Sequence, residues 1–340
     1  MKRLSGHIRQ KIDCDGNMKQ SVSSYLFGIA ILTALPGMPA AAQGYPEKPI
    51  RVVIPFAAGA GSDITSRIVA NDMQQRLGTT LIMDNRPGAN GMLAAETVAR
   101  AAPDGYTLFF TTVSTQAANP SLFKKLPYDP IRDFTPVGRI SLSQHVLAVH
   151  PSVKASNVQD LVQLARSQPG KLSYATSNAG SLVSAEWLKA MAQVDIVGVP
   201  YNSNPTALTD LIAGRTQVMF PDQNSGAPMI NSGKLRILAV TGLARSPIFP
   251  DTPTMQEAGF SGFTINVWSG VYGPAGLPQT VVQQLSQALN ASLRNPATLE
   301  KFNAAGSIPS PLSPEQFAQF ARSEVDVWKR AITAAKIELQ

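Results

Sequence analysis

The stretch from Ile50 to Asp63 most constrains what this chain can fold into. A β-branched run, Ile50 to Ile54, has the composition of a strand and ends at Pro55. The turn Gly59-Ala60-Gly61 comes next, followed by an amphipathic segment, Ile64 to Leu77. A strand, a glycine-rich turn and a helix start in this order form a cradle for an anion, because the unpaired amides of the helix start point at it.

The same alternation of strands and helices continues along the chain. Further strands are expected at Thr80–Asn85, Tyr106–Thr112, Val146–Val149, Leu172–Thr176, Ile196–Val199, Gln217–Phe220, Leu235–Thr241 and Phe263–Tyr272. Helices are expected between them, including Met92–Ala101, Asn157–Ser167 with a capping box from Ser156 and Gln159, Pro205–Ala213 and Asn224–Asn231. The alternation predicts two βαβ blocks with mainly parallel sheets, and a helical tail whose last helix starts at Ser313 and Pro314.

Two further turns rich in hydroxyl groups follow predicted strands. One runs from Thr111 to Thr115, and the other from Ser177 to Ser181. Ligands of open α/β sheets bind at the carboxyl ends of the strands. Two such blocks facing each other would therefore hold a small anion between helix N-termini.

The N-terminus has the layout of a secretory signal. An apolar run from Tyr25 to Leu35 is preceded by Met18-Lys19 and followed by Ala40-Ala41-Ala42. The run is too short for a membrane span of ~20 residues. We expect cleavage near Ala42, translation from Met18, and an exported protein.

Charge and cysteine content exclude several partners. Residues 1–42 contain the single cysteine, Cys14, and leave 24 basic and 20 acidic residues in the remaining chain, a net charge of +4. That chain contains no basic block and no basic patch interleaved with aromatic residues, so we expect no nucleic-acid partner. A mild positive balance favours small anions.

The sequence gives little support for catalysis or for metal binding. It contains no G-x-S-x-G, H-E-x-x-H or C-x-x-C motif. Beyond the leader the only histidines are His145 and His150, whose spacing on a strand places them on opposite faces. We therefore expect no enzyme activity, no cofactor and no metal. A dinucleotide site at Gly59–Asp63 is disfavoured because the third glycine of G-x-G-x-x-G is missing.

Many short motifs give the chain a family resemblance. They are Tyr45-Pro46-x-Lys48-Pro49-Ile50-Arg51, Pro55-Phe56, Asn85-Arg86-Pro87-Gly88, Ala102-Pro103-Asp104-Gly105-Tyr106-Thr107-Leu108, Leu126-Pro127-Tyr128-Asp129-Pro130, Val199-Pro200-Tyr201, Gly233-Lys234-Leu235-Arg236, Pro250-Asp251-x-Pro253-Thr254 and Gly273-Pro274-Ala275-Gly276. With these motifs in order from about Tyr45 to near the C-terminus, the chain resembles the solute-binding proteins of tripartite tricarboxylate transporters, the Bug-type or TctC-like family.

The resemblance implies an α/β, type II periplasmic-binding-protein fold, with two α/β lobes around a ligand cleft and two interlobe crossings. Residues 43–143 and 265–340 would form lobe 1, residues 144–264 lobe 2, and residues 1–42 the extension and signal peptide. The crossings are expected near Ser141–Val146 and Phe263–Asn266. The family also implies capture of a small organic carboxylate by hinge closure and its delivery to membrane permease subunits, and we expect a monomer.

Site residues are transferred from the family position by position. The first lobe would contribute the loop Phe56, Ala58, Gly59, Ala60, Gly61, Ser62 and Asp63, together with Thr112 and Ser114. The second lobe would contribute Ser177, Asn178, Gly180, Ser181, Tyr201, Asn202 and Asp222. Two departures are visible: Ala60 stands where the family commonly has glycine, and the segment from Tyr174 to Glu186 looks about two residues shorter than in common members.

Several of these residues have a structural alternative. Asp63 would bond loop amides or select a solute that carries an amine. Asn178 and its neighbours would form an ordinary helix cap as readily as a binding turn. Tyr201 would close over the ligand or remain a strand-end tyrosine, and Asp222 would cap the next helix or orient Tyr201.

Two other classes of function remain open at this point. The protein could present its ligand to a membrane sensor, and the membrane protein that co-purifies with it would separate that role from transport. It could also be a cleft enzyme acting on a small acid, which recovery of unchanged ligand would argue against.

Overall fold

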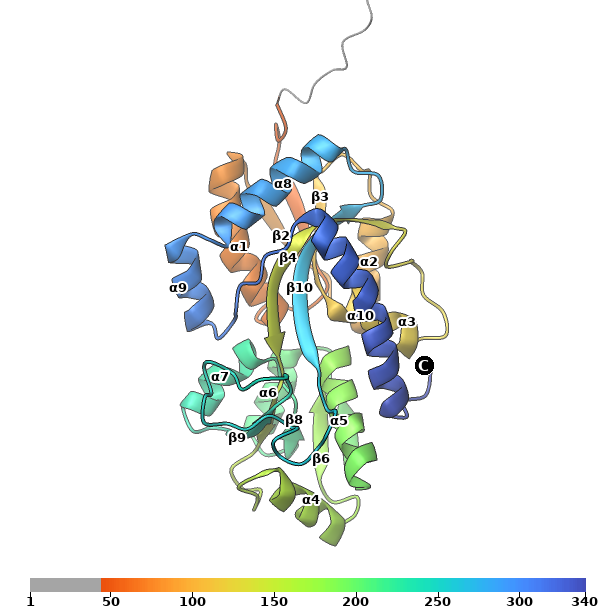
Figure 1. Cartoon of the computed structure of the whole chain (residues 1–340), viewed down its shortest axis with the longest axis vertical. Helices are drawn as coiled ribbons and strands as arrows, with labels where there is room; N and C mark the ends of the chain where they lie inside the picture. Colours follow the sequence, from red (N-terminus) through yellow and green to blue (C-terminus); the bar gives the residue numbers. More distant parts are fainter. Residues whose placement is uncertain (1–43) are drawn as a thin grey trace, which may run out of the picture. The chain divides into compact units, whose positions relative to one another are not determined.

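The computed structural model describes residues 44–340, and the predicted signal peptide and its cleavage site near Ala42 lie outside them. The chain forms two five-stranded sheets (Figure 1). The first sheet has the strand order β2 (Leu81–Asn85), β1 (Ile50–Ile54), β3 (Thr107–Thr112), β10 (Asn266–Pro274) and β4 (Phe134–Gln144). The second has the order β7 (Val197–Pro200), β6 (Ser173–Thr176), β8 (Val218–Met219), β5 (Val146–Val149) and β9 (Arg236–Val240).

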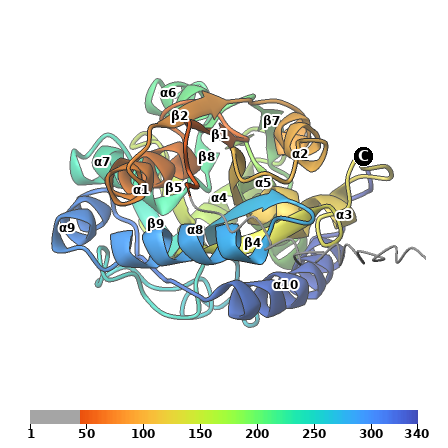
Figure 2. The same ribbon diagram turned by 90° about the horizontal axis from the view of Figure 1, so that it is seen from above.

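Helices cover both sheets. The first sheet and the helices packed on it are called the first lobe: α1 (Gly61–Leu77), α2 (Met92–Ala99), α3 (Asn119–Leu122), α8 (Gln279–Ser292), α9 (Pro296–Ala304) and α10 (Pro314–Ala334). In both views α8 and α9 lie beside α1, so the end of the chain completes the lobe that its beginning starts (Figure 2). The second sheet carries α4 (Val158–Ser167), α5 (Ala179–Ala192), α6 (Asn204–Ile212) and α7 (Gln223–Asn231), and together they form the second lobe. The predicted residue boundaries of the lobes remain a prediction.

Each sheet contains one strand that runs against its neighbours. β10 is antiparallel to β3 and β4, and β5 is antiparallel to β8 and β9, whereas β1 pairs with β2 and β3 in parallel, as β6 does with β7 and β8. Four of the five strands in each sheet therefore run the same way, as predicted for mainly parallel sheets, and one opposing strand makes each sheet mixed. β5 and β10 each enter their sheet directly from the other lobe, without a helix, so they start at the edge where their neighbours end.

The chain crosses between the sheets twice, side by side. β4 ends at Gln144 and β5 begins at Val146, and the return crossing leads from β9 to Asn266 at the start of β10. The Thr241 hydroxyl joins the two crossings, because it donates to the Ile265 carbonyl oxygen at 2.8 Å and accepts from the His145 backbone N–H at 3.0 Å. The predicted fold, two α/β lobes with two interlobe crossings, is confirmed.

Several local predictions need correction. Strand β4 was not predicted, because Pro136, Gly138 and several polar residues interrupt the run of apolar residues that indicates a strand. It lies at the edge of its sheet, where proline is tolerated. The hydroxyl-rich segment after β3 is a π-helix (Ser114–Ala118) that continues into α3, not a turn. The cap of α4 is Asn157, one residue after the predicted Ser156. A short 3-10 turn, η1 (Ala89–Gly91), precedes α2.

Aromatic packing fastens α10 to the first sheet. The α10 start is as predicted, with Ser313 and Gln316 forming a capping box and Pro314 in the first turn. Phe317 is fully buried, with its ring centroid 4.9 Å from that of Tyr272 and 5.5 Å from that of Trp268. A methyl group on Gly270 would lie 2.2 Å from the Phe317 ring, so the helix approaches the strand as closely as glycine allows.

No helix within residues 44–340 combines the length and the apolar character needed to cross a membrane.

Replacing Phe317 by alanine tests this packing. Removing a fully buried phenylalanine leaves a cavity, so Phe317→Ala is expected to lower the free energy of unfolding by about 3–5 kcal/mol. Phe320→Ala is the matched control, since Phe320 is half-buried on the same helix and also contacts Trp268. Urea unfolding measures both variants; equal losses would contradict the role assigned to Phe317.

Candidate functional site

A small cavity of about 40 Å³ lies between the two lobes. It holds roughly three water-sized groups at ~10–15 Å³ each. Its walls come from the carboxyl ends of β3 and β6, from the loop after β8, and from the crossing strands β4 and β10. The cavity therefore lies at the strand edge where open α/β sheets bind their ligands.

The loop after β1 leaves the start of α1 open to this cavity. Gly59 has a φ of 79°, which glycine adopts at little cost, while Ala60 has a φ of −68° and needs no glycine. Among the residues described, no side chain caps α1, whose first residues, Gly61 and Ser62, line the cavity. Their amides thus face the space that an anion would occupy.

Asp63 points away from the cavity and holds the loop in place. Its carboxylate accepts hydrogen bonds from the Gly59 N–H at 2.9 Å, from the Asn85 amide at 2.9 Å and from the Arg67 guanidinium at 2.9 Å. Burial opposes ionisation, but these bonds outweigh it and keep the pKa of Asp63 below its usual value. The prediction that Asp63 bonds a loop amide is confirmed.

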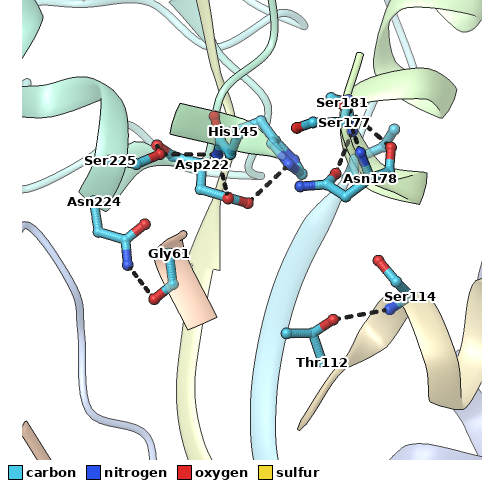
Figure 3. A network of polar contacts seen from close by, with 12 residues as sticks. Gly61, Thr112, Ser114, His145, Ser177, Asn178, Ser181, Asp222, Asn224 and Ser225 are labelled. Atoms are coloured by element: carbon cyan, nitrogen blue, oxygen red, sulfur yellow. Dashed lines mark hydrogen bonds and ion pairs between the residues drawn. The ribbon is translucent and has the colours of Figure 1, made fainter. Parts of the chain in front are cut away.

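Helices of the second lobe also begin at the cavity. Asn178 caps α5, with Ser181 completing a capping box, and Gly180 in the first turn lines the cavity. Asn204, in the first turn of α6, lines it as well. So does Asn224, in the first turn of α7, whose side chain points toward Gly61 (Figure 3). Each helix start carries a partial positive charge, so the four starts together favour an anion.

An ionisable pair, His145 and Asp222, forms part of the wall. Their side chains point toward each other (Figure 3), with His145 Nε2 3.3 Å from Asp222 Oδ1, and the His145 side chain is 1% exposed. A methyl group on Gly180 would lie 2.1 Å from the His145 ring, so the glycine allows α5 to begin against the ring. Burial opposes ionisation of Asp222, but contacts with His145, Asn204 and Asn178 outweigh it and lower its pKa.

Of the two roles predicted for Asp222, orienting Tyr201 was wrong, and the helix cap is confirmed in position only. Asp222 occupies the N-cap position of α7 but makes no side-chain cap bond. It does not orient Tyr201, whose hydroxyl donates to Asp210 at 2.9 Å. Its Oδ2 instead accepts from Asn204 Nδ2 at 2.6 Å, across the second lobe.

Buried hydroxyl groups complete the wall. Within residues 44–340, the hydroxyls of Ser62, Ser143, Ser177 and Ser307 have no hydrogen-bond partner, and all four residues line the cavity. A buried hydroxyl without a partner is costly, so these four are available to a polar ligand. In the part of the chain that the structure describes, no lysine or arginine lines the cavity.

The structure brings together ten of the sixteen predicted site residues. Those lining the cavity are Phe56, Ala60, Gly61, Ser62, Thr112, Ser114, Ser177, Asn178, Gly180 and Asp222. Of the others, Gly59, Asp63 and Ser181 shape the two turns, and Ala58 is exposed. Tyr201 and Asn202 line a neighbouring hollow that also includes Phe56, Ser177 and Asn178.

The remaining lining residues were not predicted as site residues. They are Thr65, Val113, Ser141, Ser143, Gln144, His145, Asn204, Asn224, Val267, Trp268, Ser269 and Ser307. Most of them lie on the crossing strands β4 and β10 or at helix starts. The predicted positions of the crossings could therefore have indicated that these residues line the cavity. Ser307 comes from the loop between α9 and α10, and nothing in the sequence around it indicated a place in the cavity wall.

Two sheets joined by two crossings, with a polar cavity between them, define the class of two-lobed solute-binding proteins. The chain belongs to the tripartite tricarboxylate transporter receptor family, TctC, whose family model matches residues 65–337. BugT of Bordetella pertussis is 31% identical over 320 residues, which cover 92% of this chain and 98% of BugT.

Solved structures agree with this assignment. The R. palustris protein Rpa4515, solved with adipate, superimposes with a TM-score of 0.84 at 32% identity, covering 87% of this chain and all of that one. The periplasmic binding protein BugD superimposes with a TM-score of 0.83 at 31% identity, covering 87% of this chain and all of BugD. MatC of Rhodopseudomonas palustris, solved with malate, superimposes with a TM-score of 0.81 at 30% identity, covering 85% of this chain and all of MatC.

Asp63→Asn tests the role of Asp63 as a function of pH. A carboxyl whose pKa is lowered by folding stabilises the protein above its unfolded pKa of about 3.9, and this contribution is lost as the pH falls through the folded pKa. We expect the variant to be less stable by about 1–3 kcal/mol near neutral pH. The difference should shrink below about pH 4. Urea unfolding across pH measures it, with the exposed Asp251→Asn as control; a difference that persists in acid would contradict the assignment.

Proposed function

We propose that the chain is a periplasmic receptor that captures a small organic carboxylate between its lobes and delivers it to a tripartite tricarboxylate-type transporter. The observation that carries this proposal is the lining of the cavity. The uncapped start of α1 faces buried hydroxyls that have no partner among residues 44–340, in a wall without lysine or arginine from that range. Family membership and relatives solved with adipate and malate support it.

Neutral donors suit a receptor that must release what it binds. A carboxylate held by an arginine forms two parallel charge-assisted hydrogen bonds, which hold it tightly. Amides at a helix start and serine hydroxyls also donate to a carboxylate, each through a single bond. The cavity therefore favours an anion without adding a side-chain cation that would retain it.

Bonds between the lobes fit capture by closure. The Asn224 amide, at the start of α7, donates to the Gly61 carbonyl oxygen at 2.9 Å, and the neighbouring Gln223 amide donates to the Gly306 carbonyl oxygen at 3.0 Å. Gly61 is also the first residue of α1 and lines the cavity. Closing the lobes thus completes the site and forms bonds of its own, so a ligand that contacts both lobes favours the closed state.

A screen of organic acids by thermal shift tests the function. A ligand at a hundred times its Kd stabilises the folded state by about 2.7 kcal/mol. For a chain of this size, that corresponds to a rise in melting temperature of about 5 °C. We expect at least one small mono-, di- or tricarboxylate to give such a rise, and titration calorimetry then gives its Kd. A screen in which no carboxylate raises the melting temperature would overturn the proposal.

Two serine variants locate the binding. Ser62→Ala and Ser177→Ala each remove a hydroxyl from the cavity wall. A hydrogen bond to a charged group contributes about 1.5–3 kcal/mol, so each variant should weaken binding of the carboxylate at least about tenfold. Ser323→Ala is the control, since its hydroxyl bonds the Phe320 carbonyl oxygen on the exposed side of α10. Unchanged affinity in both cavity variants would place the carboxylate elsewhere.

A further inference from the structure

One part of the cavity wall offers hydrogen-bond acceptors instead of donors. Asp222 and Asn204 both line it, and Asn204 is 3% exposed. Asn204 Nδ2 donates to Asp222 Oδ2 at 2.6 Å and to the Ser225 hydroxyl at 3.0 Å. Because an ionised carboxylate only accepts, the amide nitrogen must face Asp222, which turns the Asn204 oxygen the other way. That oxygen has no partner within residues 44–340.

These acceptors lie beside the start of α1. A methyl group built on Gly61 would be 3.0 Å from Asp222 Oδ2 and 2.5 Å from Asn224 Oδ1. A solute carboxylate seated on the amides of Gly61 and Ser62 would therefore have the Asp222 carboxylate as a close neighbour. The donors and the acceptors of the cavity lie only a few bond lengths apart.

The acceptor wall makes a plain carboxylate a poor occupant. Two negative charges 4 Å apart repel by about 4 kcal/mol at the effective dielectric constant of a protein surface. His145 Nε2 lies 3.3 Å from Asp222 Oδ1, but no lysine or arginine of the described range lines the cavity. A donor group on the solute, placed next to its carboxylate, would convert this repulsion into a hydrogen bond to Asp222.

Asp63 is not available for this task. It is the other acidic residue near the α1 start, but its carboxylate already accepts from Gly59, Arg67 and Asn85. Asp222 itself lines the cavity, with its Oδ2 accepting from Asn204, its Oδ1 3.3 Å from His145 Nε2 and Asn178 also in contact. The selection of a donor-bearing solute therefore falls to Asp222.

We propose that the solute carries a hydroxyl or ammonium group next to a carboxylate, and that Asp222, with the Asn204 amide oxygen, accepts its hydrogen bonds. This inference rests on the proposed function, since it concerns a carboxylate in the same cavity. Asp222 is then the residue that distinguishes hydroxy and amino acids from unsubstituted acids of the same length.

Matched sets of acids test the inference by titration calorimetry. The sets share a carbon skeleton: propionate, lactate and alanine; succinate, malate and aspartate; glutarate, 2-hydroxyglutarate and glutamate. In the set that binds tightest, we expect a substituted acid to bind at least about tenfold more tightly than the plain acid, the difference that one hydrogen bond to a charged group contributes. Equal or tighter binding of the plain acid would overturn the inference.

Asp222→Asn identifies the residue responsible. It keeps the shape of the side chain but removes its charge. The ratio of the Kd of the plain acid to the Kd of the substituted acid should therefore fall toward one. Asn204→Ala, which removes the second acceptor, should reduce the preference as well. The matched control is Asp210→Asn, since Asp210 lies in the same lobe and bonds Tyr201 and Arg215 outside the cavity. Circular dichroism and melting temperature confirm that each variant is folded.

The outcomes separate this inference from the proposed function. If no acid of any set binds the wild-type protein and none raises its melting temperature, the proposed function itself fails. If acids bind with no preference for a donor, or if Asp222→Asn keeps the full preference, the carboxylate receptor stands and the role of Asp222 is overturned.

Discussion

The site depends on how the chain passes from one sheet to the other. β4 ends at Gln144 and β5 begins at Val146, so a single residue, His145, separates strands of different lobes. In the first sheet Gln144 pairs with Asn266, and in the second Val146 pairs with Val240. Both crossings therefore lie at the edges where the parallel strands end. Because helices follow those strands, their N-termini are brought to one place, and the cavity forms between them.

The sequence predicted the parts of this arrangement that are encoded locally. The β-branched run of β1, the glycine turn before α1 and the capping residues of α10 agree with the structure, because each depends on neighbouring residues. Strand β4 was missed because its stability comes from pairing with β10, more than a hundred residues away. Ser307, at the cavity wall, likewise carries no local signal.

The two aspartates show the same limit at the site. Asp63 follows the glycine turn and its bond to a loop amide was predictable from spacing alone. Asp222 was expected to act on its own helix or on Tyr201, but it meets His145 and Asn204, which come from other elements. Local pattern thus predicted how the loop before α1 is built, while the surroundings of Asp222 in the cavity wall are set by tertiary contacts.

The helix starts have a consequence for how this receptor can evolve. The attraction they exert comes from backbone amides of α1, α5, α6 and α7, which almost any sequence compatible with the fold retains. Four short side chains on the wall, Ser62, Ser143, Ser177 and Ser307, have hydroxyls that make no hydrogen bond within residues 44–340. If the proposed function is right, substitutions at positions such as Ser62 or Ser177 would change which acid fits while the helix starts still favour an anion. Duplicated copies of such a gene would then diverge without passing through a form that binds nothing.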